Sequence, residues 1–218
     1  RASHADEAKR LDIAARLDFS RVEFLDKETF TDLGRGRVKG LDIVGKVRTR
    51  KGKLEVVLIH VEVEGRTREE FEGRMYDYYH TLRLRHQCPV LPIALFLSGG
   101  AVGLDRPTYY DRPLGENVCD FRFWRVSLKR LRGAEYVGLR NPLAAGLAAL
   151  MTPGTPTRWE WKLACLKAVT RTRVDAARRS LLADCVESYL PLEGDEASRF
   201  EATLAGEENT EVNEMRKT

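Results

Sequence analysis

The stretch VKGLDIVGKVRTRKGKLEVVLIHVEVE, residues 38–64, decides which fold the sequence favours. Residues 38–48 and 54–64 each alternate between apolar and polar side chains, which is the pattern of β-strands whose two faces differ. In both strands the apolar or small residues hold odd-numbered positions. The even-numbered positions turn polar at the same end, with Asp42, Lys46, Arg48, His60, Glu62 and Glu64. We therefore expect a hairpin with a buried odd-numbered face and a polar even-numbered face.

The connection between the two strands sets how those faces align. A two-residue turn at Lys51-Gly52 would put odd-numbered residues opposite even-numbered ones. A three-residue loop over residues 50–52 instead pairs Thr49 with Lys53 and keeps the two apolar faces together. Gly52 then occupies the loop position that favours a left-handed backbone. The three-residue loop is the predicted one.

This register predicts a pair of acids on one face of the hairpin. Asp42 lies opposite His60, and Glu62 is its diagonal neighbour, roughly 7–8 Å away at the backbone. Two carboxylates so placed repel each other unless a cation lies between them. Carboxylate oxygens and water suit Mg²⁺ or Mn²⁺. A solvated sheet face with mixed charges is the alternative, and the pattern by itself leaves both open.

The segments that follow predict a layered α/β or α+β domain. Thr67 to Glu70 form a capping box, which favours a helix over residues 67–86. Further strands are expected at 90–97 and 118–126, separated by a Gly- and Pro-rich loop at 99–116. Because a helix joins the second and third strands, these two should be parallel. Helical patterns cover residues 142–151, 157–172, 174–189 and 195–205.

These patterns divide the chain into three expected parts. Residues 1–132 form the α/β core, 133–205 a C-terminal helical extension, and 206–218 a flexible acidic tail. Residues 193–218 carry eight acids and three bases, although the formal net charge of the whole chain is +4. A basic body with an acidic tail fits a nucleic-acid partner, and it also fits an ordinary soluble protein.

Composition argues against several other classes of protein. The chain has 218 residues, of which 43% are hydrophobic and 32% charged, and it has no apolar run long enough to span a bilayer. The four cysteines are widely spaced and lack the spacing of a zinc site. We expect a cytoplasmic protein with reduced thiols and no membrane partner.

Four segments together resemble a known family. They are FLDKE (24–28), GLDIVGKVR (40–48), LIHVEVE (58–64) and RMYDYY (74–79). In this order they are similar to the recombination-promoting nuclease (Rpn) / putative transposase family, within the PD-(D/E)XK nuclease superfamily. The resemblance covers residues 14–97, and it implies a restriction-endonuclease-like mixed sheet flanked by helices.

The resemblance also implies an activity, a metal and its ligands. An activity like that of the family would be a Mg²⁺-dependent DNA endonuclease linked to transposition or recombination. Asp42 and Glu62 match the metal-binding acids, and the backbone carbonyl of Val63 would be a further ligand. Glu64 stands where the superfamily usually has Lys and this family Gln, so Lys46 is a candidate to replace that Lys from the other strand. Asp42, Glu62, Glu64 and Lys46 are thus the expected catalytic residues.

A second set of residues is expected to contact DNA. Arg74 matches the family's Arg in RMYDYY, and Arg48, Arg50 and Lys51 belong to a group of bases close in sequence to the acids. A solubilising rim is the alternative for these bases. Two other functions stay open on the same fold: a catalytically weak DNA-binding or regulatory module, and an oligomerisation module that uses the late helices. A homodimer is left open for all three.

Overall fold

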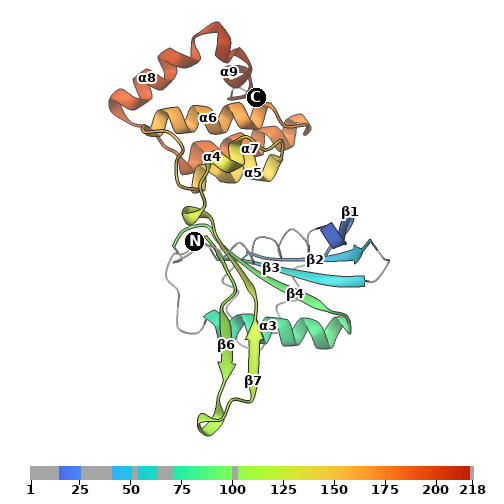
Figure 1. Ribbon diagram of the computed structural model, residues 1–218. Helices are drawn as coiled ribbons and strands as arrows, with labels where there is room; N and C mark the ends of the chain where they lie inside the picture. The colour runs from blue at the N-terminus through green and yellow to red at the C-terminus, as the bar shows by residue number, and fades with distance from the viewer. Residues whose placement is uncertain (1–14, 26–40, 51–53, 63–70, 100–102, 217–218) are drawn as a thin grey trace. The chain divides into compact units, whose positions relative to one another are not determined.

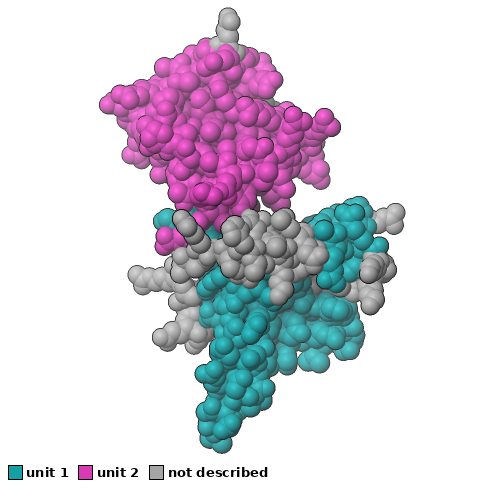
Figure 2. Space-filling model, in the orientation of Figure 1, with its two compact units in different colours: residues 1–129 teal, residues 130–218 magenta. Residues whose placement is uncertain are grey.

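The protein is described by a computed structural model covering residues 15–25, 41–50, 54–62, 71–99 and 103–216 (Figure 1). The chain divides into two compact units, residues 1–129 and 130–218 (Figure 2). The sequence pattern put this boundary at residues 132 and 133. The fold class is mixed α/β, of the α+β kind.

Unit 1 is built on a mixed sheet of six strands. Their order is β1-β2-β3-β4-β8-β5. The strands are β1 (Leu17–Phe24), β2 (Leu41–Thr49), β3 (Leu54–Glu62), β4 (Val90–Phe96), β5 (Leu104–Asp105) and β8 (Trp124–Ser127). β2 is antiparallel to both β1 and β3, whereas β3, β4 and β8 run parallel. The expected parallel pairing of the second and third predicted strands is confirmed, as β3 with β4.

Helix α3 (Phe71–His86) connects β3 to β4 and packs on the sheet (Figure 1). Its buried residues Phe71, Met75 and Leu82 form one core with Val44 of β2 and with Ala94 and Phe96 of β4. These strand residues hold even-numbered positions. The expectation that only the odd-numbered face is buried is therefore wrong for β2: Val44 is 1% exposed and Ile43 is 42% exposed. The reason is that α3 covers the even-numbered face.

Two strands of unit 1 form a separate ribbon. β6 (Thr108–Asp111) pairs antiparallel with β7 (Cys119–Arg122) and extends from the sheet (Figure 1). The single strand expected at 118–126 is thus two strands, β7 and β8, in different sheets, and the loop expected at 99–116 contains β5 and β6. Tyr109 at the base of the ribbon lies 5.2 Å from Tyr76 of α3, measured between ring centroids.

Unit 2 is helical, and three of its helices, α5, α6 and α7, begin at residues whose side chains cap them. The helices are α4 (Ala134–Val137), α5 (Pro142–Leu147), α6 (Arg158–Thr170), α7 (Ala176–Tyr189), α8 (Gly194–Leu204) and α9 (Thr210–Arg216). Thr157 and Glu160 form a capping box at the start of α6, and Asp175 caps α7. Trp161 and Phe200 lie in the core of this unit, each 1% exposed.

The end of the chain differs from the expected flexible tail. Residues 210–216 form α9, and Val212 and Met215 on it are buried in the core of unit 2. Arg216 donates to Glu187 of α7 over 2.6 Å and lies 3.1 Å from a Glu201 oxygen of α8. Apolar anchoring and ion pairs fix this segment although its composition is acidic. No helix in the described part of the chain is long and apolar enough to cross a membrane.

Candidate metal and nucleic-acid site

The hairpin of β2 and β3 has the predicted register. Asp42 pairs with His60, and the pairing continues without a shift to Arg48 and Leu54. This is the register that a three-residue loop produces, although residues 51–53 lie outside the described part of the chain. Glu62 is two residues beyond His60 in β3, so its backbone position is diagonal to that of Asp42.

The two acids occupy one end of the sheet. Glu62 is the last residue of β3, and it pairs with Phe96, the last residue of β4. Phe96 pairs in turn with Ser127, the last residue of β8. Because β2 runs the other way, its beginning, with Asp42, reaches the same end. The carboxyl ends of three parallel strands and the start of a fourth strand thus meet along one edge.

The beginning of α3 lies at this same end. The rings of Phe71, its first residue, and Phe96 are 4.9 Å apart. The guanidinium of Arg74 lies over the Phe71 ring, 5.5 Å from its centroid. A helix N-terminus favours anions, and an Arg in the first turns adds a full charge to that field. The expected capping box at residues 67–70 lies outside the described residues.

Two acids in diagonal register are a donor set that fits Mg²⁺ or Mn²⁺. The ligand carbonyl implied at Val63 and the third acid, Glu64, follow β3 directly but lie outside the described residues. One further polar atom is notable at this end of the sheet. The hydroxyl of Ser127 is buried and has no hydrogen-bond partner among the described residues. It lies two strands from Glu62, in the same row.

Lys46 does not belong to this end of the sheet. It is four residues from Asp42, which is about 13 Å along a strand. Its ammonium lies 3.7 Å from a carboxylate oxygen of Glu23 in β1. Lys46 also lies close to His86, the last residue of α3. The pKa of His86 is lowered mainly by burial and secondly by the charge of Lys46. The prediction that Lys46 replaces a catalytic lysine therefore gains no support from its position, because Lys46 lies by the last residue of α3.

The predicted basic surface is also further from the acids than expected. Arg48 and Arg50 are exposed, and both lie at the loop end of the hairpin. Arg48 is six residues from Asp42, about 20 Å along the strand. Lys51 lies outside the described residues. These bases do not surround the acids, so any contact with a substrate is with more distant parts of it.

Arg125 is a charged residue that the sequence pattern did not single out. A continuous row of pairs runs from Asp42 through His60 and Ala94 to Arg125 and Asp105. The Arg125 guanidinium donates to both oxygens of Asp105, over 2.8 and 2.5 Å, and lies 3.8 Å from Glu72 of α3. The bonds to Asp105 are the main reason that the pKa of Arg125 is raised. This network fixes α3 and β5 against β8.

Within the described ranges, no group of three or more His, Cys, Asp or Glu side chains is arranged to hold a metal ion. Comparison with known proteins identifies no relative. No family model matches the chain, and no curated protein or solved structure is significantly similar to it.

Proposed function

We propose that this chain is a Mg²⁺-dependent DNA endonuclease of the PD-(D/E)XK kind, linked to transposition or recombination. One observation carries the proposal: the β2–β3 register brings Asp42 and Glu62 to diagonal positions at one sheet end, beside the N-terminal turn of α3. The resemblance of residues 14–97 to the recombination-promoting nucleases supports the same residues. The mixed sheet with α3 on one face agrees with the architecture that this resemblance implies.

The proposed roles follow from charge. Asp42, Glu62 and the carbonyl of Val63 would hold the cation, which supplies an activated water and neutralises charge on the phosphate. Arg74 and the start of α3 would bind the scissile phosphate or its neighbour. Arg48, Arg50 and Lys51 would contact phosphates further along the DNA, since about 20 Å corresponds to about six base-pair steps. A cytoplasmic location belongs to this proposal.

Glu64 would add a third carboxylate to the proposed site. A third acid strengthens cation binding and repels the substrate phosphate, unless it holds a second ion. This balance determines whether the chain cuts DNA quickly or slowly. Glu64 therefore counts here as a modulating acid rather than as the usual water-orienting group.

Cleavage of supercoiled plasmid in Mg²⁺ tests the proposal. Asp42→Asn and Glu62→Gln keep the side-chain shape and remove one charge each. We expect each to reduce the nicking rate at least about 100-fold, because each removes an anionic oxygen from the cation. The measurement is the rate of conversion to open-circular DNA at saturating Mg²⁺ for the full chain.

Glu23→Gln is the matched control. It removes a carboxylate from the same sheet, but beside Lys46 rather than beside Asp42. Its nicking rate should stay within about twofold of the original, since a half-exposed ion pair contributes little. Wild-type nicking by Asp42→Asn or Glu62→Gln would refute the site, and so would an equal loss in Glu23→Gln.

A DNA-binding or regulatory module without strong catalysis is the second candidate. Two observations favour it. Lys46 lies near the last residue of α3 and not near its first turn, and Glu64 occupies the position of the usual Lys or Gln. Calorimetric titration with Mg²⁺ separates the two candidates. Mg²⁺ binding that is lost in Asp42→Asn but accompanies no nicking would support the module, and binding together with nicking would support the enzyme.

A further inference from the structure

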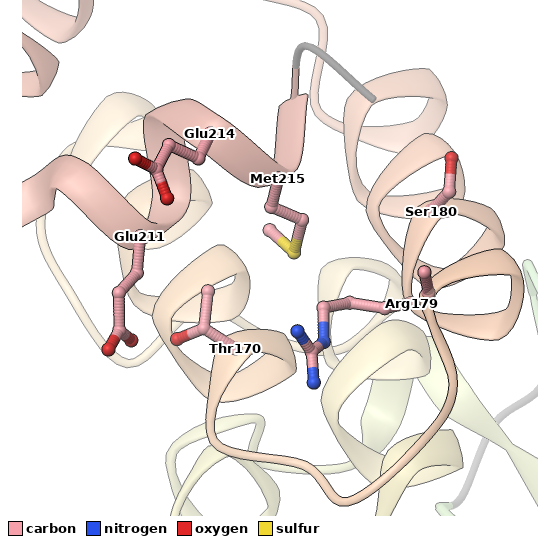
Figure 3. A pocket seen from close by; sticks show the side chains of 7 residues that line it. Thr170, Arg179, Ser180, Glu211, Glu214 and Met215 are labelled. Atoms are coloured by element: carbon pink, nitrogen blue, oxygen red, sulfur yellow. The ribbon is translucent and has the colours of Figure 1, made fainter.

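Unit 2 contains a pocket that the proposed nuclease site does not use. It has a volume of about 470 Å³ and lies between the end of α6, the first turns of α7 and α9 (Figure 3). This volume is in the range of sites for small molecules, about 300–1,000 Å³. Its lining residues are Thr170, Ala176, Arg179, Ser180, Glu211, Glu214 and Met215.

Arg179 is the cation of the pocket, and its hydrogen bonding is incomplete. Its side chain extends from α7 toward Thr170 (Figure 3). One terminal nitrogen donates to the carbonyl of Val174 over 3.4 Å, which is a long hydrogen bond. Its Nε is buried and has no partner within the described part of the chain. The charge of this guanidinium, whose terminal nitrogen makes only a long bond to Val174, would stabilise an anionic group that enters the pocket.

The opposite wall of the pocket is acidic. Glu211 and Glu214 are three residues apart on α9, so they share a face of that helix. Both carboxylates lie across the pocket from Arg179 (Figure 3). Glu214 has interactions of its own, so Glu211 is the acid that we assign to a ligand. An ammonium group is the natural partner for this wall.

The mixture of charges restricts what can bind. A simple anion would be attracted by Arg179 and repelled by two carboxylates. A simple cation would be attracted by the carboxylates and repelled by Arg179. A molecule with an anionic and a cationic end satisfies both walls. Between these ends, Ala176 and Met215 offer apolar contact to a short carbon chain, and the hydroxyl of Thr170, which donates to the Lys167 carbonyl over 3.0 Å, keeps lone pairs as acceptors.

We propose that this pocket binds a small zwitterion of amino-acid size, with its carboxylate on Arg179 and its ammonium on Glu211. The proposal concerns unit 2 alone, so it stands or falls independently of DNA cleavage. The helical unit would then have a ligand-binding function that is separate from the function of unit 1.

Calorimetric titration of the full chain with three zwitterions tests this. Glycine, 4-aminobutyrate and 6-aminohexanoate carry the same two charges at increasing separations. Each is compared with the carboxylate and the amine of the same chain length. We expect at least one zwitterion to bind about tenfold or more tightly than both of its singly charged analogues, because each end makes a charge-assisted contact. If none of the three shows this preference, the proposal is wrong.

Two variants assign the ends of the ligand. Arg179→Gln should remove the preference of the zwitterion over the amine, and Glu211→Gln the preference over the carboxylate. Arg178→Gln is the matched control, because Arg178 is on the same helix but does not line the pocket, and its side chain is 76% exposed. If Arg179→Gln does not fold, Glu211→Gln carries the test alone, since Glu211 is exposed. Unchanged preferences in Glu211→Gln, or equal losses in Arg178→Gln, would overturn the assignment.

Discussion

Two cations near the acids in sequence have different positions in the structure. Lys46 shares the even-numbered positions of β2 with Asp42, yet it pairs with Glu23 and lies close to the last residue of α3. Arg74 is on another element, and its guanidinium stacks on Phe71 at the first turn of that helix. Alternation identifies the face that Lys46 shares with Asp42, and the four-residue spacing already puts Lys46 about 13 Å further along the strand. The structure adds the neighbour of each cation, which is Glu23 for Lys46 and the Phe71 ring for Arg74.

This difference predicts effects of different size for two matched variants. Arg74→Gln should weaken DNA binding about tenfold, because it removes a charged contact to phosphate near the cation. Lys46→Gln should change both binding and nicking by less than about twofold, because its ion pair is partly exposed. Fluorescence anisotropy with a short duplex and the nicking assay measure these quantities. A larger effect of Lys46→Gln than of Arg74→Gln would contradict the positions assigned here.

Among the elements, the hairpin register and the parallel β3–β4 pair follow from local pattern, and the sequence predicts both. The break at Phe123, where the chain leaves one sheet for another, was missed although the sequence contains a sign of it. In CDFRFWRV the apolar residues hold odd-numbered positions up to Phe123 and even-numbered positions from Trp124. Helix α9 was missed since its acidic composition suggested a loose tail. The spacing of Val212 and Met215, three residues apart and both buried, is the signal that could have revealed it.

Helix α4 offers a test of packing by two glycines at its ends. A Cβ on Gly133 would overlap the buried Trp161 ring, with Cη2 only 2.7 Å away, whereas a Cβ on Gly138 meets nothing within 4 Å. Both glycines have right-handed helical backbone angles, so alanine is unstrained at either position. Gly133→Ala should therefore reduce the free energy of unfolding of unit 2 by about 1–3 kcal/mol.

Gly138→Ala is the control for that prediction. It should be neutral, or stabilise by up to about 1 kcal/mol, because it only restricts the unfolded chain. Thermal melts of the full chain, followed by far-ultraviolet circular dichroism, compare the two. Equal melting temperatures for both variants would mean that Trp161 can move aside without cost.

For the whole molecule, the distribution of bases between the two units predicts how DNA binding depends on salt. Replacing Arg48, Arg50 and Lys51 together with alanine should reduce the slope of log K against log salt by about 0.9 for each phosphate contact that is lost. The matched control replaces three bases of unit 2, Arg171, Arg173 and Arg178, which are exposed. A reduced slope only in the control would move the DNA surface to the helical unit.

The strand order of unit 1 has a consequence for how fast the protein folds. β8 pairs with β4 although about 30 residues separate them, so the sheet closes late. The helices of unit 2 also pack on partners that are distant in sequence, but each helix forms first through contacts between residues three or four apart. Local contacts form faster than distant ones. The three tryptophans report on both processes, since Trp124 is on β8 and Trp159 and Trp161 are on α6. In stopped-flow refolding, Trp124→Phe should remove the slow fluorescence phase and leave the fast one. A single phase in the original protein, or a slow phase that persists in Trp124→Phe, would contradict this order.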